Sequence, residues 1–229
     1  MRQRRMWSFL VVASLSALSL AWTQEYTLRV NVKEGETYKY KMTMDIDFGG
    51  QLVVFSVTII NKVVKVDSEG NYTIESTQEN GLVKFGDQEM PAPGGLPTKT
   101  TFRPNGSLLK MEGENNPAAG SFNSMNYPDK PVKVGDKWEH EYQPSKESPK
   151  IKVEYEVVGV EKVNEIDTLK IRVKGKSLDE SQMPMSFDGH TWVDTKTGMM
   201  VRTTMAIKGL PVQGAPAPID GTMRMELVK

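Results

Sequence analysis

The chain has 229 residues, with 29 basic and 29 acidic side chains and no cysteine. The lack of cysteine excludes disulfides and thiolate metal sites. A near-neutral, evenly mixed surface gives no electrostatic attraction for nucleic acid or anionic membranes. The length suffices for one large or two small domains with an apolar core.

The amino-terminal 21 residues have the order typical of a secretory signal peptide. Three arginines lie between positions 2 and 5, an apolar run covers 7–20, and the small residues Ser19 and Ala21 indicate cleavage after Ala21. A retained membrane anchor is the alternative, but the run is short and interrupted by serines. We therefore expect an exported protein, periplasmic or extracellular, without stable membrane insertion after signal removal. Cleavage leaves 26 basic and 29 acidic side chains, a net charge of −3.

From Tyr26 onward the dominant hydrophobic period is two residues, which is typical of antiparallel strands with one solvated face. The clearest case is 37–48, TYKYKMTMDIDF, where every even-numbered position is aromatic or aliphatic. The segments with the same period are 151–157, 168–174 and 222–227. The segment 51–60 is apolar at both parities, which predicts burial on both sides of the sheet.

Turn signals with Gly or Asn separate these segments, and no window shows a sustained helical period. The sequence predicts about a dozen strands joined mostly by hairpins. The expected fold is all-β, with a strongly curved antiparallel sheet that is a half-barrel or barrel-like, or with two related β-meanders. Three Pro- and Gly-rich stretches, 87–99, 113–131 and 209–221, are predicted loops because Pro removes ladder donors. A short helix near 118–125 is an alternative within the second stretch.

The sequence VKEGETYKYKM at 32–42 is echoed by VKVGDKWEHEY at 132–142. Gly35 and Gly135 are each followed by an acidic residue and, two positions later, by an aromatic residue. Either a β-meander is duplicated, or one tight turn with Gly at positive φ starts a long strand twice. The repeated order of the segments that follow favours duplication.

The predicted organisation is therefore a single all-β domain after the signal peptide. Its ranges are 1–21 for the signal peptide, 22–229 for the domain, about 25–112 and 131–229 for the pseudo-repeat halves, and 113–130 for the Pro/Gly/Asn-rich linker.

Four segments carry a family resemblance: YTLRVNVKEGETYKYKM, VVKVDSEGNYTIE, VKVGDKWEHEY and HTWVDTKTGMMVR. Together they resemble a family of exported bacterial proteins of unknown function. The last is also similar to the penultimate hairpin of the lipoprotein-carrier (LolA/LolB-like) half-barrels, where an aromatic strand ending in Asp turns through Thr-Gly. The resemblance implies an envelope protein with a curved antiparallel sheet around an apolar cavity, and no catalytic residues. The chain lacks the clear plug helices of those carriers.

The segments 107–110, 121–123 and 196–198 reproduce, in order, the three motifs of the serine β-lactamase and penicillin-binding fold. That chemistry places the serine at a helix start, with the lysine one turn later. Here Ser107 follows an Asn-Gly turn and leads into an alternating strand, where positions i and i+3 face opposite sides. We interpret the pattern as chance and predict no enzyme activity.

Three Met-x-Met pairs each project two thioethers from one strand face, an arrangement suited to Cu(I). They are Met42 and Met44, Met183 and Met185, and Met223 and Met225. The segment 181–190 is the best copper candidate because it also contains His190. Core filling is the stronger interpretation, and Met-rich faces also suit an adaptable apolar pocket. His140 and His190 have no third ligand at suitable spacing, so no metal site or cofactor is predicted.

The function that the sequence favours is non-catalytic binding of a hydrophobic or lipid-like ligand by a concave sheet. The predicted ligand-binding residues are Tyr38, Tyr40, Met42, Met44 and Trp138. The alternative is a structural or partner-binding envelope module that uses the Pro/Gly loops and the open sheet edges. The predicted partners are thus a hydrophobic small molecule or an envelope protein.

Overall fold

The computed structural model describes residues 24–92, 94–112, 125–143, 150–178, 184–210 and 218–228. The predicted signal peptide, most of the predicted linker and most of the alternative helix lie outside these ranges. The described residues form twelve strands: β1 Thr37–Phe48, β2 Gln51–Val66, β3 Tyr72–Phe85, β4 Gln88–Pro91, β5 Thr98–Phe102, β6 Leu108–Glu112, β7 Lys137–Tyr142, β8 Ile151–Val163, β9 Ile166–Ser177, β10 Ser186–Asp194, β11 Met200–Leu210 and β12 Ile219–Val228.

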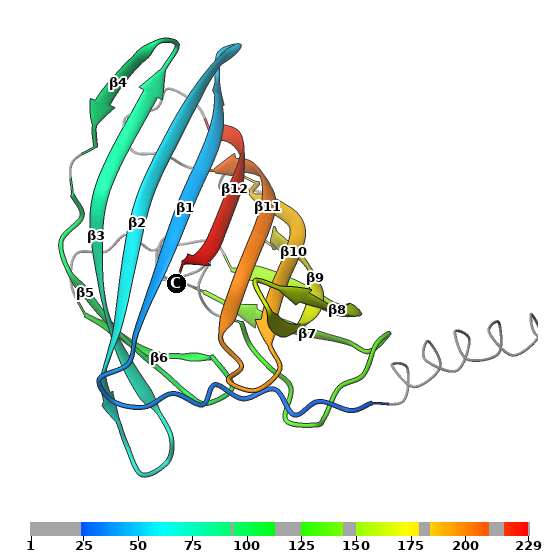
Figure 1. Cartoon of the computed structure of the whole chain (residues 1–229). Helices are drawn as coiled ribbons and strands as arrows, with labels where there is room; N and C mark the ends of the chain where they lie inside the picture. Colours follow the sequence, from blue (N-terminus) through cyan, green and yellow to red (C-terminus); the bar gives the residue numbers. More distant parts are fainter. Residues whose placement is uncertain are drawn as a thin grey trace, which may run out of the picture.

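All twelve strands belong to one sheet, in which every neighbouring pair is antiparallel. The order is β6-β5-β3-β2-β1-β12-β11-β10-β9-β8-β7, and β4 also pairs with β3. From the central β1–β12 pair the chain runs outward to β6, then begins again at β7 and returns strand by strand to β12 (Figure 1). The prediction of an all-β, antiparallel fold is confirmed.

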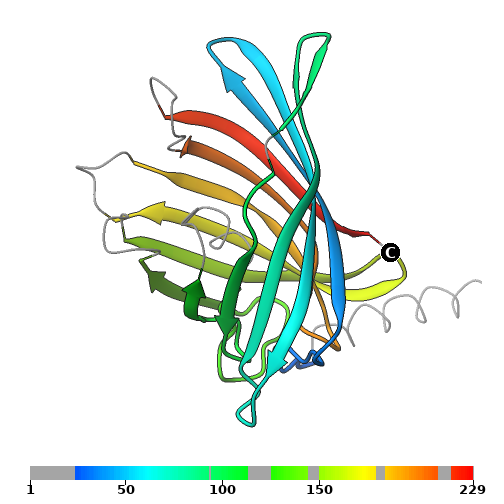
Figure 2. The ribbon, with the colours of Figure 1, turned by 90° about the vertical axis from the view of Figure 1, so that its left-hand side faces the viewer.

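The sheet is open, because the end strands β6 and β7 do not pair with each other in the part of the chain that the structure describes. Figure 2 shows β1 to β3 crossing the direction of β8 and β9, as expected when strand twist accumulates over many strands. The predicted strongly curved, barrel-like sheet is therefore wrong. The first and last strands pair in the middle of the sheet, which leaves two short strands at its edges. Charged residues on β7, including Lys137 and Glu139, discourage further pairing.

Two local predictions are also corrected. β2 lies inside the sheet, but its first half is not buried on both sides, since Leu52 is 61% exposed. The described segments that cover the sheet lie on its other face, so outer-face apolar side chains in this half of β2, such as Leu52, stay near solvent. The predicted loop 87–99 contains β4, where Pro91 lies opposite Leu82 of β3. Proline is tolerated there because the far side of β4 carries no described strand.

We call the face covered by segments 24–36 and 125–135 the inner face, and the opposite one the outer face. Register assigns the even-numbered residues of β1 and the odd-numbered residues of β2 through Ile59 to the inner face. The main core cluster lies on the inner face of β8 to β12 and includes Val157 and Ile171, both fully buried.

Residues 24–36, which we call the strap, cross one end of the inner face (Figure 1). The backbone amide of Val30 donates to the carbonyl of Pro104 in the β5–β6 turn at 2.7 Å. The next amide, that of Asn31, donates to the carbonyl of Thr197 in the β10–β11 turn at 2.8 Å. The strap thus ties turns from both halves of the sheet together.

Segment 125–135 covers the same end of the inner face. Tyr26 of the strap and Val132 exchange two backbone hydrogen bonds of 2.8 and 2.9 Å. The buried Tyr127 hydroxyl donates to the carbonyl of Gly198 at 2.7 Å, which anchors this segment to the β10–β11 turn.

The echoed sequences form the same local structure. Gly35 and Gly135 have φ of 91° and 95°, and their amides each donate over 2.8 Å to the carbonyl of a fully buried valine, Val63 or Val157. In each turn the following acid accepts a hydrogen bond from the backbone amide three residues earlier, at 2.9 and 3.0 Å. The ladder register shifts just after each valine. Each echo is thus a turn that requires glycine, followed by a bulged strand pair.

Candidate functional site

The four predicted site residues on β1 share the inner face, as the period of two requires. They differ in accessibility. Tyr40 is 2% exposed, and its hydroxyl donates to the carbonyl of Met200 at 3.0 Å. Burial raises the pKa of Tyr40 well above its ordinary value of 10. In this conformation Tyr40 offers no surface to a ligand, whereas Met42 and Met44 are half-buried.

Tyr38 lies at the strap end of β1. Its hydroxyl donates to the Glu36 carboxylate at 2.7 Å. Burial first, and then this bond, raise the pKa of the Tyr38 phenol. The pKa of Glu36 is lowered, chiefly by the hydrogen bond from the Lys33 amide and then by the Tyr38 hydroxyl. The geometry makes Tyr38 part of the turn that starts β1.

Trp138 is separated from the other four predicted site residues. It lies on β7, six strands from β1 in the sheet order, although on the same face. Its indole stacks on Tyr155 with ring centroids 5.0 Å apart, and its Nε1 donates to the carbonyl of Asn126 at 2.7 Å. The structure therefore brings Met42 and Met44 together but does not join Trp138 to them.

Two of the Met-x-Met pairs meet across the central strand pair. Met42 lies opposite Met225, and Met44 lies opposite Met223. Met223 in turn lies opposite Met205 of β11. The period of two within one strand reveals each Met-x-Met pair. It does not reveal that the two pairs lie opposite each other, because register is set by pairing between distant segments. The result is a flexible, polarisable floor in the centre of the inner face.

Beyond this floor, the inner face continues toward the β1–β2 and β3–β4 hairpins without a cover from the strap. We call this region the distal patch; its members are Met44, Ile46, Phe48, Val53, Phe55, Val83, Phe85 and Met90. Phe48 is 44% exposed, Phe85 39% and Met90 50%. Met44 and Ile46 also contact the main core, so the patch continues into the buried part of the inner face.

The signal for this patch was partly present in the sequence. Val83 and Phe85 alternate with Leu82 and Lys84, which indicates a strand face. Nothing in the sequence places that strand beside β2, and Met90 lies in a stretch whose prolines predict a loop.

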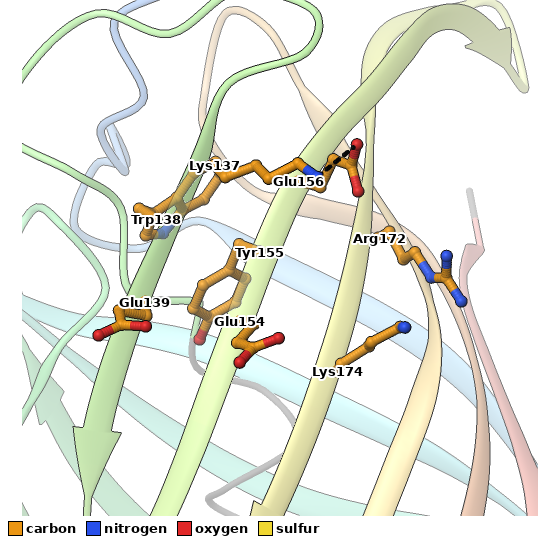
Figure 3. A pocket seen from close by; sticks show the side chains of 8 residues that line it. All are labelled: Lys137, Trp138, Glu139, Glu154, Tyr155, Glu156, Arg172 and Lys174. Carbon is orange, nitrogen blue, oxygen red and sulfur yellow. Dashed lines mark ion pairs between the residues drawn. The ribbon is translucent and has the colours of Figure 1, made fainter.

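Two hollows lie over the outer face. The first, of about 390 Å³, is bordered by three cations and three carboxylates from β7, β8 and β9 (Figure 3). Lys137 pairs with Glu156 at 3.3 Å, and Arg172 pairs with Asp188 at 2.9 Å. The second, of about 710 Å³, includes the Arg202–Glu226 pair at 2.7 Å. Opposite charges are interspersed in both, as on an ordinary solvated sheet face.

The two histidines do not form one site. His140 lies on the inner face of β7 and stacks on Tyr142, while His190 lies on the outer face of β10 near Trp192. Desolvation is the largest cause that lowers the pKa of each below 6.5. Within the described ranges no three His, Cys, Asp or Glu side chains are grouped as metal ligands. Met183 of the copper candidate lies outside the described residues.

Two of the three motifs shared with serine β-lactamases lie in the described residues, in turns and at a sheet edge. The Ser107 hydroxyl donates to Oδ1 of Asn105 at 2.8 Å, just before β6. The Thr197 hydroxyl donates to Asp194 at 2.8 Å inside the β10–β11 turn. The segment 121–123 is outside the described residues. These hydroxyls serve the turns in which they lie.

A search for membrane-spanning helices within the described ranges finds none of sufficient length and apolar character.

Comparisons with known proteins identify no family for the chain. No protein-family profile matches it, and no curated protein matches it. A crystal structure of the hypothetical lipoprotein YmcC from Escherichia coli (K12) is similar, with 14% identity, coverage of 100% of this chain and 99% of that chain, and a TM-score of 0.34. A DUF1329 family protein from Desulfovibrio piger has 13% identity, 85% coverage of each chain and a TM-score of 0.27. At these values no residue role or activity is transferred.

Proposed function

We propose that the protein is an exported, non-catalytic binding protein that holds a hydrophobic, lipid-like ligand on the distal patch of its inner face. The observation that carries the proposal is the exposure of large apolar side chains there: Phe48, Phe85 and Met90 are each at least 39% exposed and lie on one face of adjoining hairpins. Contiguous exposed apolar surface of this kind marks interaction sites in soluble proteins.

The patch also has the right continuation for an elongated ligand. It leads from the hairpin tips past Met44 to Met223 and Met205, so one end is accessible and the other is packed. Methionine side chains adapt to ligands of different shape because they are unbranched and polarisable. In this proposal Met42 and Met44 keep the role that the sequence predicts for them, and Tyr40 packs beside Met42 in the core.

The proposal assigns no chemical step to the protein. His140 and His190 lie on opposite faces of the sheet and cannot act on one bound molecule. The proposed location outside the cytoplasm rests on the basic, apolar and small residues of the first 21 positions.

The test uses an uncharged fluorophore, N-phenyl-1-naphthylamine, and a matched pair of variants on β3. Phe85→Asp places a carboxylate on the inner face, and Leu82→Asp places one on the outer face at a similar exposure, 39% against 41%. A carboxylate in an apolar contact must be desolvated, so Phe85→Asp should weaken binding about tenfold, or about 1.4 kcal/mol. Leu82→Asp should leave affinity within about twofold of the parent.

Equal affinity of both folded variants and the parent would contradict the assignment of the patch. Unfolding midpoints in urea establish that each variant is folded. Native mass spectrometry of the protein from its own envelope fraction, followed by solvent extraction, would identify a ligand that copurifies with it.

A second candidate function is partner binding at the sheet edge. Leu108 and Leu109 on the edge strand β6 are 40% and 42% exposed, and an open edge accepts an added strand. If this function applies, native mass spectrometry should detect a complex of the protein with its partner. Replacing Leu109 with Pro should then abolish this complex without changing fluorophore binding.

A further inference from the structure

Ionised side chains are almost absent from the inner-face strand positions that the structure describes. The register places the Lys, Arg, Asp and Glu residues of β1, β7, β10, β11 and β12 on the outer face. The residues between them, which face inward, are apolar or uncharged polar. Among the described inner-face positions of the sheet, Lys162 and Asp167 are the exceptions, and they pair with each other at 3.5 Å. Both belong to the β8–β9 hairpin, whose Asp167 carbonyl accepts from Thr195 in the β10–β11 turn beside the strap.

At the described inner-face positions of β2 and β4, the polar side chains that border the distal patch are neutral amides. Gln51 lies opposite Phe48, and Gln88 lies opposite Phe85, so both amides lie at the outer limit of the patch on its own face. His140, the remaining titratable nitrogen base among the inner-face positions described, lies on the edge strand β7. Desolvation lowers its pKa below 6.5, so it is neutral near pH 7.

This charge distribution disfavours an ionised ligand. An ionised headgroup at the patch would lose hydration against apolar side chains, and the described inner-face positions around the patch offer no counter-ion to replace it. An alcohol, ester or amide headgroup loses less, and two amide side chains are present to hydrogen-bond it.

From this charge distribution, and resting on the proposed function, we propose that the ligand is an uncharged single-chain lipid-like molecule that is taken up as a dispersed monomer. Its chain lies along the inner face, and its neutral polar end lies near Gln51 and Gln88. Fatty acids, other anionic lipids and cationic amphiphiles are disfavoured.

The test compares ligands that share a dodecyl chain length and differ in headgroup charge. The assay measures how well monododecanoyl glycerol, dodecanoate and dodecyltrimethylammonium displace N-phenyl-1-naphthylamine from the mature protein at pH 8, each below its critical micelle concentration. We expect the neutral ester to bind at least about tenfold more tightly than either ion, a difference of about 1.4 kcal/mol.

Variants with an added charge distinguish binding at the distal patch from non-specific binding to apolar surface. Phe48→Lys adds a cation at the limit of the patch, and Leu52→Lys adds the same charge on the outer face of the adjacent strand. Phe48→Lys should improve dodecanoate binding relative to the ester by about two- to fivefold, the effect of an exposed ion pair. Leu52→Lys should leave this ratio unchanged. Both positions are more than 40% exposed, so both variants should fold.

The possible results distinguish the charge selectivity from the proposed function. Binding of the fluorophore with equal displacement by the three ligands would overturn the charge selectivity and leave the proposed function standing. Failure of the parent to bind the fluorophore or any ligand would overturn the proposed function and this inference together. Co-sedimentation with phosphatidylcholine vesicles, without displacement by monomeric ligand, would indicate a membrane-docking surface and overturn uptake of a dispersed molecule.

Discussion

Replacing Gly198 with Ala should loosen the strap. Gly198 has φ of 67°, and a Cβ there would lie 2.2 Å from the carbonyl oxygen of Arg29 in the strap. Left-handed backbone costs about 1–2 kcal/mol for a residue with Cβ, offset by about 0.4–1 kcal/mol from the less flexible unfolded chain. The clash adds to this net cost, because the strap must move away from its hydrogen bond to Thr197.

Loss of that bond, or of the bond from Tyr127 to the Gly198 carbonyl, costs about 1 kcal/mol each. The total expected loss in the free energy of unfolding is therefore about 2–3 kcal/mol, measured by urea unfolding with tryptophan fluorescence. The control is Gly135→Ala, where φ is 95° but nothing lies within 4 Å of the added Cβ. Equal destabilisation by both substitutions would refute the argument that strap contact requires glycine at position 198.

Three further outcomes are expected. Gly35→Ala and Gly135→Ala should each cost roughly 1 kcal/mol, because the two turns have the same geometry and neither Cβ meets a neighbour; a large difference in urea midpoints would separate the two turns energetically. Tyr127→Phe should cost about 1–3 kcal/mol in the same assay by leaving a buried carbonyl unpaired, and an unchanged midpoint would show that water replaces the hydroxyl. Burial raises the pKa of Tyr40 and Tyr127 in the folded state, so stability should be complete below pH 10 and should fall as pH rises above 10, where unfolded tyrosines ionise. Absorbance at 295 nm should then rise together with unfolding, and non-cooperative titration of all tyrosines near pH 10 would contradict the burial.

The fold class could be predicted from the period of two and from the turn residues between the strands. The error was the expectation of a strongly curved, barrel-like sheet, because the sheet is open. The alternation in 37–48 is local, so it correctly assigned Tyr40 and Met42 to one face. Openness depends on which strands lie at the edges, and that depends on the pairing of β1 with β12 across the whole chain. No local pattern contains that information.

The arrangement of the candidate residues could be predicted only in part, for the same reason. Met42 and Met44 are neighbours because of the period alone, whereas Trp138 has the right face but the wrong strand for contact with them. Met44 lies opposite Met223, which is 179 positions away in the sequence. Phe85 lies on the same face because β3 pairs with β2.

The sequence by itself determined the antiparallel strands, the polar and apolar sides of each strand and the two glycine turns, because these follow from side-chain alternation and backbone sterics within a few residues. Tertiary structure alone decided the strand order, the strap across one end of the inner face and the exposed apolar side chains of the distal patch at the other. These features depend on which distant segments pack together and exclude water. The free energy of that packing is a sum over the whole sheet, so no local segment determines it.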